Sequence, residues 1–371
     1  MTLRLEAVSK TVGGEVHLHP LDITLAPGSM NVVLGPTLAG KTSLMRLMAG
    51  LDRPSSGRVL VGDHDVTGLS VRRRKVAMVY QQFINYPSFT VYDNIASPLR
   101  RAKIGRAEID RRVREAAAML RLDGLLDRLP DALSGGQQQR TALARALVKE
   151  ADLLLLDEPL VNLDFKLREE LREELRALFE TRRTIVVYAT TEPLEALMIG
   201  GDTLVLDQGR LLQSGPTVSV YRTPASVRVG EVFSDPPINL IAGDVGADDI
   251  RLGGAILLPR RGHLRVLAPG AYRFGVRAHH LSVDRRHGDE VAVEGTVVLD
   301  EINGSETFIH VELGDALWVV QEEGVHGFGL GERIRFFLDP RHVFAFAPDG
   351  ALVAAPVGGD DAMAVGSGGA A

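Results

Sequence analysis

One short stretch of the chain has residues of the right types and spacing to bind phosphate. Residues 35–42 read GPTLAGKT, which fits the pattern G-x-x-x-x-G-K-[ST]; an apolar run precedes them and a helical pattern follows. In such a loop the backbone N–H groups cradle phosphate, the Lys41 ammonium reaches the β- and γ-phosphates, and the Thr42 hydroxyl ligates Mg²⁺. The predicted nucleotide-binding loop consists of Gly35, Pro36, Thr37, Leu38, Ala39, Gly40, Lys41, Thr42 and Ser43.

A second stretch supplies carboxylates. Residues 153–158 read LLLLDE, a fully apolar run that ends in two acids. In α/β proteins, ligands bind at the edge of the sheet where such strands end. Asp157 is placed to hold Mg²⁺ through a water molecule, and Glu158 is placed to orient and polarise an attacking water. A strand that simply ends in a solvated turn could show the same sequence pattern. The phosphate-binding loop argues against this alternative in this sequence, because it gives a reason for acids at this edge of the sheet.

A third stretch, LSGGQ, has two glycines directly before a predicted helix, which makes a second anion-binding nest. One chain needs only one phosphate cradle of its own. The second cradle therefore indicates an assembly in which it faces the nucleotide of a partner. Its residues are Leu133, Ser134, Gly135, Gly136 and Gln137.

The elements that would position these residues alternate along the first part of the chain. Up to about residue 234, strand-like runs alternate with helical patterns, which predicts a mostly parallel sheet with helices. The strands are expected over residues 31–34, 76–79, 153–156, 185–189 and 203–206. Leucine-rich stripes at helical spacing predict amphipathic helices over residues 108–122 and 166–181. After residue 243, short apolar runs separated by Gly, Asp and Pro predict a small β-barrel or sandwich.

Composition narrows the class of protein. The 371 residues favour two domains, and the net charge of −6 gives no reason to expect nucleic acid as a partner. The chain has no cysteine, which excludes disulfides and thiolate metal sites. Its first residues lack the apolar segment of a signal peptide, and its apolar runs are far shorter than the roughly 20 residues of a membrane span. These features predict a soluble, cytoplasmic chain.

The order of the motifs resembles that of the ATP-binding-cassette (ABC) ATPases. The loop, Gln81 in VYQQF, LSGGQ, LLLLDE and Asp164 in VNLD follow one another as in that family. The resemblance covers essentially the whole chain and is strongest to the carbohydrate-importer branch, on segments such as FGVRAHHLSV and INGSETFIHVEL. It implies an α/β P-loop nucleoside triphosphatase, an ABC ATPase with a helical subdomain, followed by a small all-β OB-type (transport-associated) domain.

The resemblance also implies domain boundaries. The ABC domain is expected over residues 1–235 and its helical subdomain over about 83–150. The OB-type regulatory domain is expected over residues 236–356. Residues 357–371 are predicted to be a disordered tail because they lack apolar surface.

The resemblance further implies how such a chain works. Two ATPase chains sandwich two ATP molecules with Mg²⁺, each between the loop of one chain and the LSGGQ signature of the other. Closure of the pair, at the cytoplasmic face of the inner membrane, drives two integral membrane permease subunits. A periplasmic or lipid-tethered solute-binding protein delivers the solute to these permeases. Gln81 would ligate Mg²⁺, sense the γ-phosphate and couple it to a groove for the permease, and Asp164 would join the two sites.

Three residues depart from the family pattern. Residues 186–194 read VVYATTEPL, in which Thr191 is expected to cap a helix, and the resemblance places Thr191 where the family has a histidine that contacts the γ-phosphate. Losing a positioned group of this kind costs roughly 2.7–4 kcal/mol of transition-state stabilisation. Val12 takes the position of an aromatic residue that stacks on adenine, a contact worth about 1–3 kcal/mol. Leu38 stands where a glycine or another small residue is usual.

These departures leave several functions open. The chain is interpreted first as the degenerate half of a heterodimer of two ATPases, as in bacterial glycerol importers, to which GPTLAGKTSLMRLMAGLD and TTEPLEAL are similar. Glycerol is then the first substrate, with a sugar or glycerol 3-phosphate as the alternatives. A homodimeric importer ATPase and a non-hydrolysing, ATP-binding regulatory subunit are the competing hypotheses. A soluble cassette protein of DNA repair or translation would carry a long coiled coil or a second cassette, and this sequence has neither.

Overall fold

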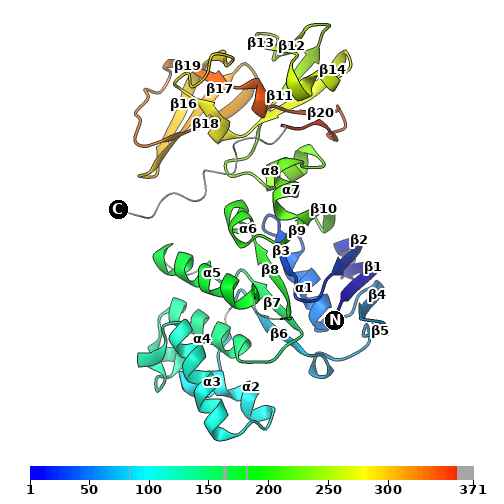
Figure 1. Ribbon diagram of the computed structural model, residues 1–371, viewed down its shortest axis with the longest axis vertical. Helices are drawn as coiled ribbons and strands as arrows, with labels where there is room; N and C mark the ends of the chain where they lie inside the picture. Colours follow the sequence, from blue (N-terminus) through cyan, green and yellow to red (C-terminus); the bar gives the residue numbers. More distant parts are fainter. Residues whose placement is uncertain (83, 162–164, 181–182, 357–371) are drawn as a thin grey trace. The chain divides into compact units, whose positions relative to one another are not determined.

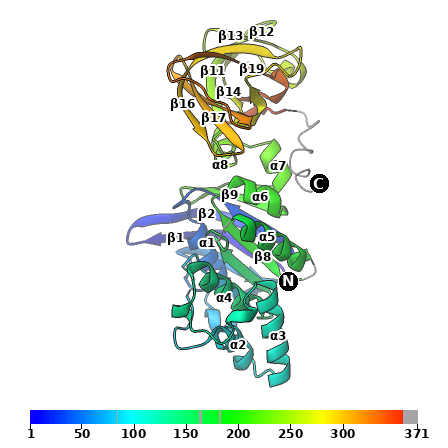
Figure 2. The ribbon, with the colours of Figure 1, turned by 90° about the vertical axis from the view of Figure 1, so that its left-hand side faces the viewer.

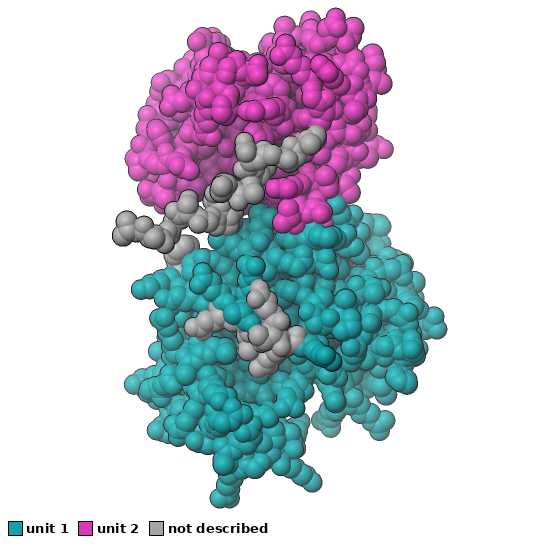
Figure 3. Space-filling model, viewed as in Figure 1, with its two compact units in different colours: residues 1–217 teal, residues 218–371 magenta. Residues whose placement is uncertain are grey.

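The computed structural model describes all residues except 83, 162–164, 181–182 and 357–371. It divides into two compact units, Met1–Thr217 and Val218–Ala371, which Figure 3 distinguishes by colour. Asp164 and the predicted tail therefore lie outside the described residues. Among the helices that the structure describes, none has the length and apolarity that a membrane crossing requires.

The first unit is built on a six-stranded sheet in the order β10-β9-β3-β8-β7-β6. All neighbours in it are parallel except the edge pair β10 and β9. Its strands are β3 (Met30–Leu34), β6 (Val76–Val79), β7 (Leu153–Asp157), β8 (Ile185–Thr190), β9 (Asp202–Asp207) and β10 (Arg210–Pro216). Every residue of β7 and β8 is buried, as expected for central strands covered on both faces. The predicted, mostly parallel sheet is thus confirmed.

A smaller antiparallel sheet, in the order β2-β1-β4-β5, belongs to the same unit. Its strands are β1 (Leu3–Val12), β2 (Glu15–Leu25), β4 (Ser56–Val61) and β5 (His64–Asp65). Helix α1 (Lys41–Ala49) buries Leu44, Met45 and Leu47 in one apolar core that takes side chains from both sheets. This packing fixes α1, and so the loop that precedes it, against the ends of the strands.

Helices α2, α3 and α4 form a helical region beside the large sheet, as Figures 1 and 2 both show. The helices are α2 (Val91–Arg101), α3 (Arg106–Met119), α4 (Gly135–Leu147), α5 (Phe165–Glu180), α6 (Pro193–Ile199), α7 (Thr217–Arg222) and α8 (Val227–Val232). The helix predicted over residues 108–122 ends earlier than expected, because Arg121 adopts a left-handed conformation with φ 51°.

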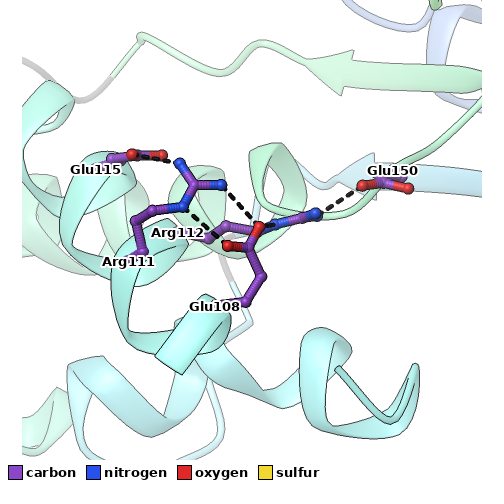
Figure 4. A network of polar contacts seen from close by, with 5 residues as sticks. All are labelled: Glu108, Arg111, Arg112, Glu115 and Glu150. Atoms are coloured by element: carbon purple, nitrogen blue, oxygen red, sulfur yellow. Dashed lines mark hydrogen bonds and ion pairs between the residues drawn. The ribbon is translucent and has the colours of Figure 1, made fainter. Parts of the chain in front are cut away.

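A network of charged side chains covers the solvent face of α3 (Figure 4). Glu108 accepts hydrogen bonds from Arg111 and Arg112, which hold its pKa at about 2. Arg111 also donates to Glu115, and Arg112 donates to Glu150, which follows α4. Because these groups are largely exposed, the network links α3 to the end of α4 without adding much stability.

The second unit contains two antiparallel sheets around one apolar core. The first consists of β11 (Asn239–Val245), β12 (Asp249–Leu252), β13 (Ile256–Pro259), β14 (Gly270–Val276), β20 (Phe344–Phe346) and β21 (Leu352–Ala354). The second consists of β15 (Leu281–Ser282), β16 (Val291–Ile302), β17 (Glu306–Leu313), β18 (Ala316–Glu323) and β19 (Arg333–Leu338). Trp318, Phe274 and Phe336 are fully buried between them. The predicted small all-β domain is confirmed.

One buried amide organises the segment that enters the helical region. Asn94, in α2, is fully buried, and its side-chain N–H groups donate to the carbonyl oxygens of Tyr86, Phe89 and Thr90. Its Oδ1 accepts from the Tyr86 N–H at 2.8 Å and from the Arg145 guanidinium at 3.1 Å. A buried group this well satisfied rigidifies its surroundings, so the side chain sets the path of residues 86–90.

We expect Asn94→Ala to lower the free energy of unfolding by about 2–4 kcal/mol, because it leaves several buried polar groups without partners. Chemical denaturation of the full chain, followed by far-UV circular dichroism, measures this change. Asn85→Ala is the matched control. Within the described residues Asn85 makes one hydrogen bond, to the Gln138 carbonyl, and its Oδ1 has no partner. Equal losses for the two variants would contradict the role given to Asn94.

Candidate functional site

The ends of three parallel strands meet at one edge of the large sheet. β3 leads into the phosphate-binding loop, β7 ends at Asp157, and β8 ends at Thr190. Backbone hydrogen bonds join them there: the Gly35 N–H donates to the Thr190 carbonyl at 3.3 Å, and the Glu158 N–H donates to the Ala189 carbonyl at 3.0 Å. The edge is therefore one hydrogen-bonded unit, at the place where ligands bind in this kind of sheet.

The phosphate-binding loop ends at the N-terminus of α1, as the motif predicts. Gly40 precedes the helix with φ 101°, and a Cβ atom there would lie 2.8 Å from the Leu18 side chain and 3.0 Å from the His17 carbonyl. The Ala39 carbonyl accepts a hydrogen bond from the Gly209 N–H at 3.0 Å. Only glycine fits at position 40, and the free N–H groups of the first turn of α1 are available to phosphate.

Lys41 lies inside the loop and is held by it. Its ammonium donates to the carbonyl oxygens of Gly35 at 2.8 Å and Pro36 at 3.1 Å. It also lies 3.4 Å from Glu158 Oε1. Burial lowers the pKa of Lys41, and the nearby Glu158 carboxylate opposes this change. The structure therefore brings the predicted phosphate-binding cation and the predicted catalytic carboxylate together.

The predicted Mg²⁺ residues also converge. The Thr42 hydroxyl donates to Asp157 Oδ2 at 2.7 Å, and the Gln81 amide donates to Glu158 Oε2 at 2.9 Å. Burial raises the pKa of Asp157, while the Thr42 hydroxyl lowers it. Hydroxyl, amide and carboxylate oxygens form the donor set that Mg²⁺ prefers, so Thr42, Gln81 and Asp157 suit the metal that the family uses with ATP.

The rest of the loop keeps its turn despite the unusual leucine. Leu38 adopts φ 67°, a conformation that costs a residue other than glycine about 1–2 kcal/mol, and its side chain is 94% exposed. Thr37 is also exposed, Pro36 and Ser43 are half-buried, and Ala39 is buried in the core beneath. The leucine thus projects into solvent at the mouth of the loop and does not pack against it.

The strand tip after β8 differs from its prediction. Glu192, and not Thr191, is the N-cap residue of α6. The Glu192 side chain makes no capping hydrogen bond in the described residues, and the Thr190 hydroxyl accepts the Glu192 N–H at 3.0 Å, so the capping role expected of Thr191 is wrong. Glu192 itself forms an ion pair with Arg168 of α5 at 3.0 Å, which holds its carboxylate on that helix. Within the described residues, no hydrogen bond involves the Thr191 hydroxyl.

The LSGGQ signature forms the start of α4. Ser134 caps the helix: its hydroxyl accepts the Gln137 N–H at 3.3 Å, and the Gln137 side chain accepts the Ser134 N–H at 3.0 Å. Because of this capping box, Gly135 and Gly136 lie within the first turn of α4, whereas the sequence had predicted them before the helix. Leu133 is buried. In the described part of the chain, no hydrogen bond or ion pair joins the signature to the phosphate-binding loop.

Val12 lies at the tip of a hairpin. It is the last residue of β1 and pairs with Glu15 across a turn formed by Gly13 and Gly14, both with positive φ. Its side chain is 48% exposed. The sequence predicted only apolar contact with a base from this residue, and its exposure is compatible with that contact.

A cavity of about 600 Å³ lies in the first unit between β6, α2 and α4. Its lining comprises Val76, Ala77, Met78, Tyr86, Phe89, Ser97, Pro98, Arg100, Arg101, Ala142, Arg145, Ala146 and Lys149. Tyr86 lines it, and the Arg145 guanidinium lies 4.9 Å from the Tyr86 ring centroid. Tyr92, in contrast, interacts with Asp110 of α3. The cavity is basic and partly aromatic, and its lining residues lie on both sides of Gln81 in the chain, residues 76–78 before it and Tyr86 and Phe89 after it.

Sequence reasoning missed the polar contacts behind the strand tip. Glu195 is 5% exposed and accepts hydrogen bonds from Thr190 Oγ1 at 2.5 Å and from the Tyr188 hydroxyl at 3.3 Å. Gln139, also buried, donates from α4 to the Pro159 carbonyl at 2.6 Å, directly after the predicted catalytic carboxylate, Glu158. The spacing of Glu195, three residues after the cap Glu192, is the one sequence signal that could have drawn attention to the first of these groups.

Comparisons with known proteins agree with this geometry. Residues 18–161 match the family described as ABC transporter, and residues 274–346 match the TOBE domain. The chain is 37% identical over 358 residues to the sn-glycerol-3-phosphate import ATP-binding protein UgpC of Cupriavidus necator, covering 94% of this chain and 97% of that protein. For the protein of the same name from Escherichia coli (strain K12), identity is 37% over 326 residues, covering 86% and 90%.

A solved structure shares the fold of the first unit. The post-hydrolysis dimer of the ATP-binding cassette MJ0796, bound to ADP and Pi, aligns with a TM-score of 0.54 at 29% identity. The alignment covers 58% of this chain and 98% of that cassette.

The relatives and the solved cassette confirm the predicted fold class, the ATPase activity coupled to transport, and the use of ATP with Mg²⁺. They also agree with the predicted role of a peripheral ATP-binding subunit of a membrane importer. The chain belongs to the ATP-binding subunits of ABC transporters, in the carbohydrate-importer branch.

Proposed function

We propose that the chain hydrolyses ATP to energise uptake of a small polyol phosphate, with glycerol 3-phosphate as the first candidate. The observation that carries this proposal is the convergence of Lys41, Glu158 and the Thr42–Asp157 pair at one sheet edge. Relatives that align over nearly the whole chain are named for import of sn-glycerol 3-phosphate. The sequence favoured glycerol as the transported solute, and the names of these relatives favour glycerol 3-phosphate instead. A sugar is the remaining alternative.

The contacts of Lys41 and Glu158 suggest how the site works. The Lys41 ammonium donates to loop carbonyl oxygens and forms an ion pair with Glu158. A bound triphosphate would bind this ammonium more strongly, because its oxygens carry more negative charge. Once Lys41 contacts phosphate, Glu158 is free to orient and polarise the attacking water, with the Gln81 amide beside it. Thr42, Gln81 and Asp157 would hold Mg²⁺, which neutralises charge on the β- and γ-phosphates.

We further propose that the chain acts as one of two ATPase subunits. Its signature is a helix N-terminus without bonds to its own loop in the described residues, so it suits the nucleotide of a partner. The related cassette MJ0796 is described as a dimer. Two permeases and a solute-binding protein complete the proposed importer. The basic cavity near Tyr86 is proposed to receive a permease helix.

The proposal of a non-identical partner is based on the residues that follow strand β8. Thr191 offers only a hydroxyl where the family has an imidazole, and Glu192 is held by Arg168 and does not replace it. We therefore propose that this chain's own site turns over slowly and that the chain pairs with a second, non-identical ATPase. A homodimer is the alternative, and a non-hydrolysing regulatory subunit is the third possibility.

Glu158→Gln is expected to lower kcat for ATP hydrolysis by about 10²–10⁴-fold, the usual contribution of a general base, while ATP still binds. Steady-state phosphate release by the full chain, with nucleotide binding measured separately, checks this expectation. The control is Glu150→Gln, an exposed carboxylate on the surface network. Retention of most of the turnover by Glu158→Gln would show that another group activates the water.

Thr191→His is expected to raise turnover about tenfold or more, equivalent to about 1.4 kcal/mol of barrier, because it restores the reach and charge of an imidazole. The measurement is ATP hydrolysis by the purified chain at saturating ATP, with native and variant proteins side by side. Brisk turnover by the native chain that histidine hardly changes would favour the homodimer. A silent native chain that histidine activates supports the mixed pair.

Deletion of the encoding gene is expected to abolish high-affinity uptake of radiolabelled glycerol 3-phosphate, and expression of the chain from a plasmid should restore it. Glycerol and a disaccharide serve as parallel substrates. Loss of glycerol or sugar uptake, with glycerol 3-phosphate uptake unchanged, would reassign the solute while leaving the ATPase role intact.

A further inference from the structure

A buried carboxylate lies directly behind the strand tip that carries Thr191. Glu195 is only 5% exposed, although it belongs to the short helix α6. Burial raises its pKa, and the Thr190 hydroxyl and the Arg168 guanidinium oppose that effect. Buried carboxyl groups are rare unless hydrogen bonds satisfy them, and no step of the reaction described above uses this one.

The hydrogen bonds of Glu195 form an altered helix cap. A glutamate three residues after the cap ordinarily accepts the backbone N–H of the cap residue itself. Here the Thr190 hydroxyl stands between the two: it accepts the Glu192 N–H at 3.0 Å and donates to Glu195 Oε2 at 2.5 Å. The Tyr188 hydroxyl donates to the other carboxyl oxygen at 3.3 Å. The carboxyl group of Glu195 therefore links the end of strand β8 to the first turn of α6 through hydrogen bonds.

The same threonine is bonded to the nucleotide loop. The Thr190 carbonyl accepts the Gly35 N–H at 3.3 Å, and the neighbouring Ala189 carbonyl accepts the Glu158 N–H at 3.0 Å. Thr190 thus joins Glu195 on one side to the first residue of the phosphate-binding loop on the other. Thr191 follows it in the chain, so its position depends on how Thr190 is held.

We propose that Glu195 is a positioning residue for ATP hydrolysis. Through the Thr190 hydroxyl it fixes the turn between β8 and α6 and sets Thr191 against the γ-phosphate. The inference rests on the proposed role of the strand tip, and it does not depend on the transported solute. A hydroxyl tip gains most from such positioning, because its hydrogen bond to phosphate requires a suitable distance and angle, whereas a charged group also attracts phosphate from a wider range of positions.

The test compares ATP with ADP, because only ATP carries the γ-phosphate. Mg-ATP and Mg-ADP are titrated calorimetrically into the full chain carrying Glu158→Gln, which prevents turnover, with and without a second substitution. Glu195→Leu and Thr190→Val are expected to reduce the preference for ATP over ADP about tenfold, the lower end of the worth of one hydrogen bond to a charged group, with ADP affinity nearly unchanged. Glu195→Gln should keep most of the preference, since its amide oxygen still accepts from Thr190.

Matched variants separate positioning from stability. Glu173→Gln, at an exposed site on α5, is the control and should leave both affinities unchanged. A merely structural role would lower the melting temperature and weaken both nucleotides alike. If Glu195→Leu does not fold, Thr190→Val decides the question alone, because valine keeps the volume and removes only the hydroxyl.

Two results would overturn the inference in distinguishable ways. If the parent binds ATP and the folded variants keep its preference over ADP, Glu195 has no positioning role. If the parent binds neither nucleotide, the proposed function fails and the positioning role fails with it.

Discussion

The site depends on backbone hydrogen bonds between strands that are distant in sequence. The phosphate-binding loop, the paired acids and the strand tip each follow a different strand, and each is rigid only because its strand has neighbours. The bond from Gly35 to Thr190 and the bond from Glu158 to Ala189 extend that pairing by one step beyond the strands. The distances between the proposed catalytic side chains are therefore set by the sheet. A small shift at the edge of the sheet would change all of these distances together.

The convergence of the proposed site residues was predictable from sequence because they lie in short, ordered motifs. Lys41, Thr42, Asp157 and Glu158 were identified by type and spacing, and the structure brings them into two contacting pairs, Lys41 with Glu158 and Thr42 with Asp157. The apolar run of β7 was equally clear, since a strand buried on both faces has no polar positions to confuse the pattern. Here local pattern and long-range pairing agree.

What the sequence did not reveal was which polar side chains act through tertiary contacts. Thr190 and Thr191 are adjacent and chemically identical, so propensity could not say which hydroxyl would bond to the start of α6; it is Thr190, which donates to the buried Glu195 carboxyl and accepts the N–H of the cap residue Glu192. Asn94 likewise resembles any helix residue until its five hydrogen bonds are seen. Both glycines of the signature were expected before α4, and the Ser134 cap starts the helix two residues earlier, at Gly135.

The position of β3 in the sheet bears on how the protein is made. This strand, which leads into the phosphate-binding loop, lies between β8 and β9, and the Asn31 side chain also donates to the Val186 carbonyl, 155 residues away in the chain. A growing polypeptide exposes β3 early but supplies its two neighbours only after most of the unit has been synthesised. The loop therefore gains its rigid frame late on the ribosome, whereas many strands of the second unit pair with the next strand in the chain. Nucleotide binding is thus a property of the finished first unit and not of the nascent segment that carries its motif.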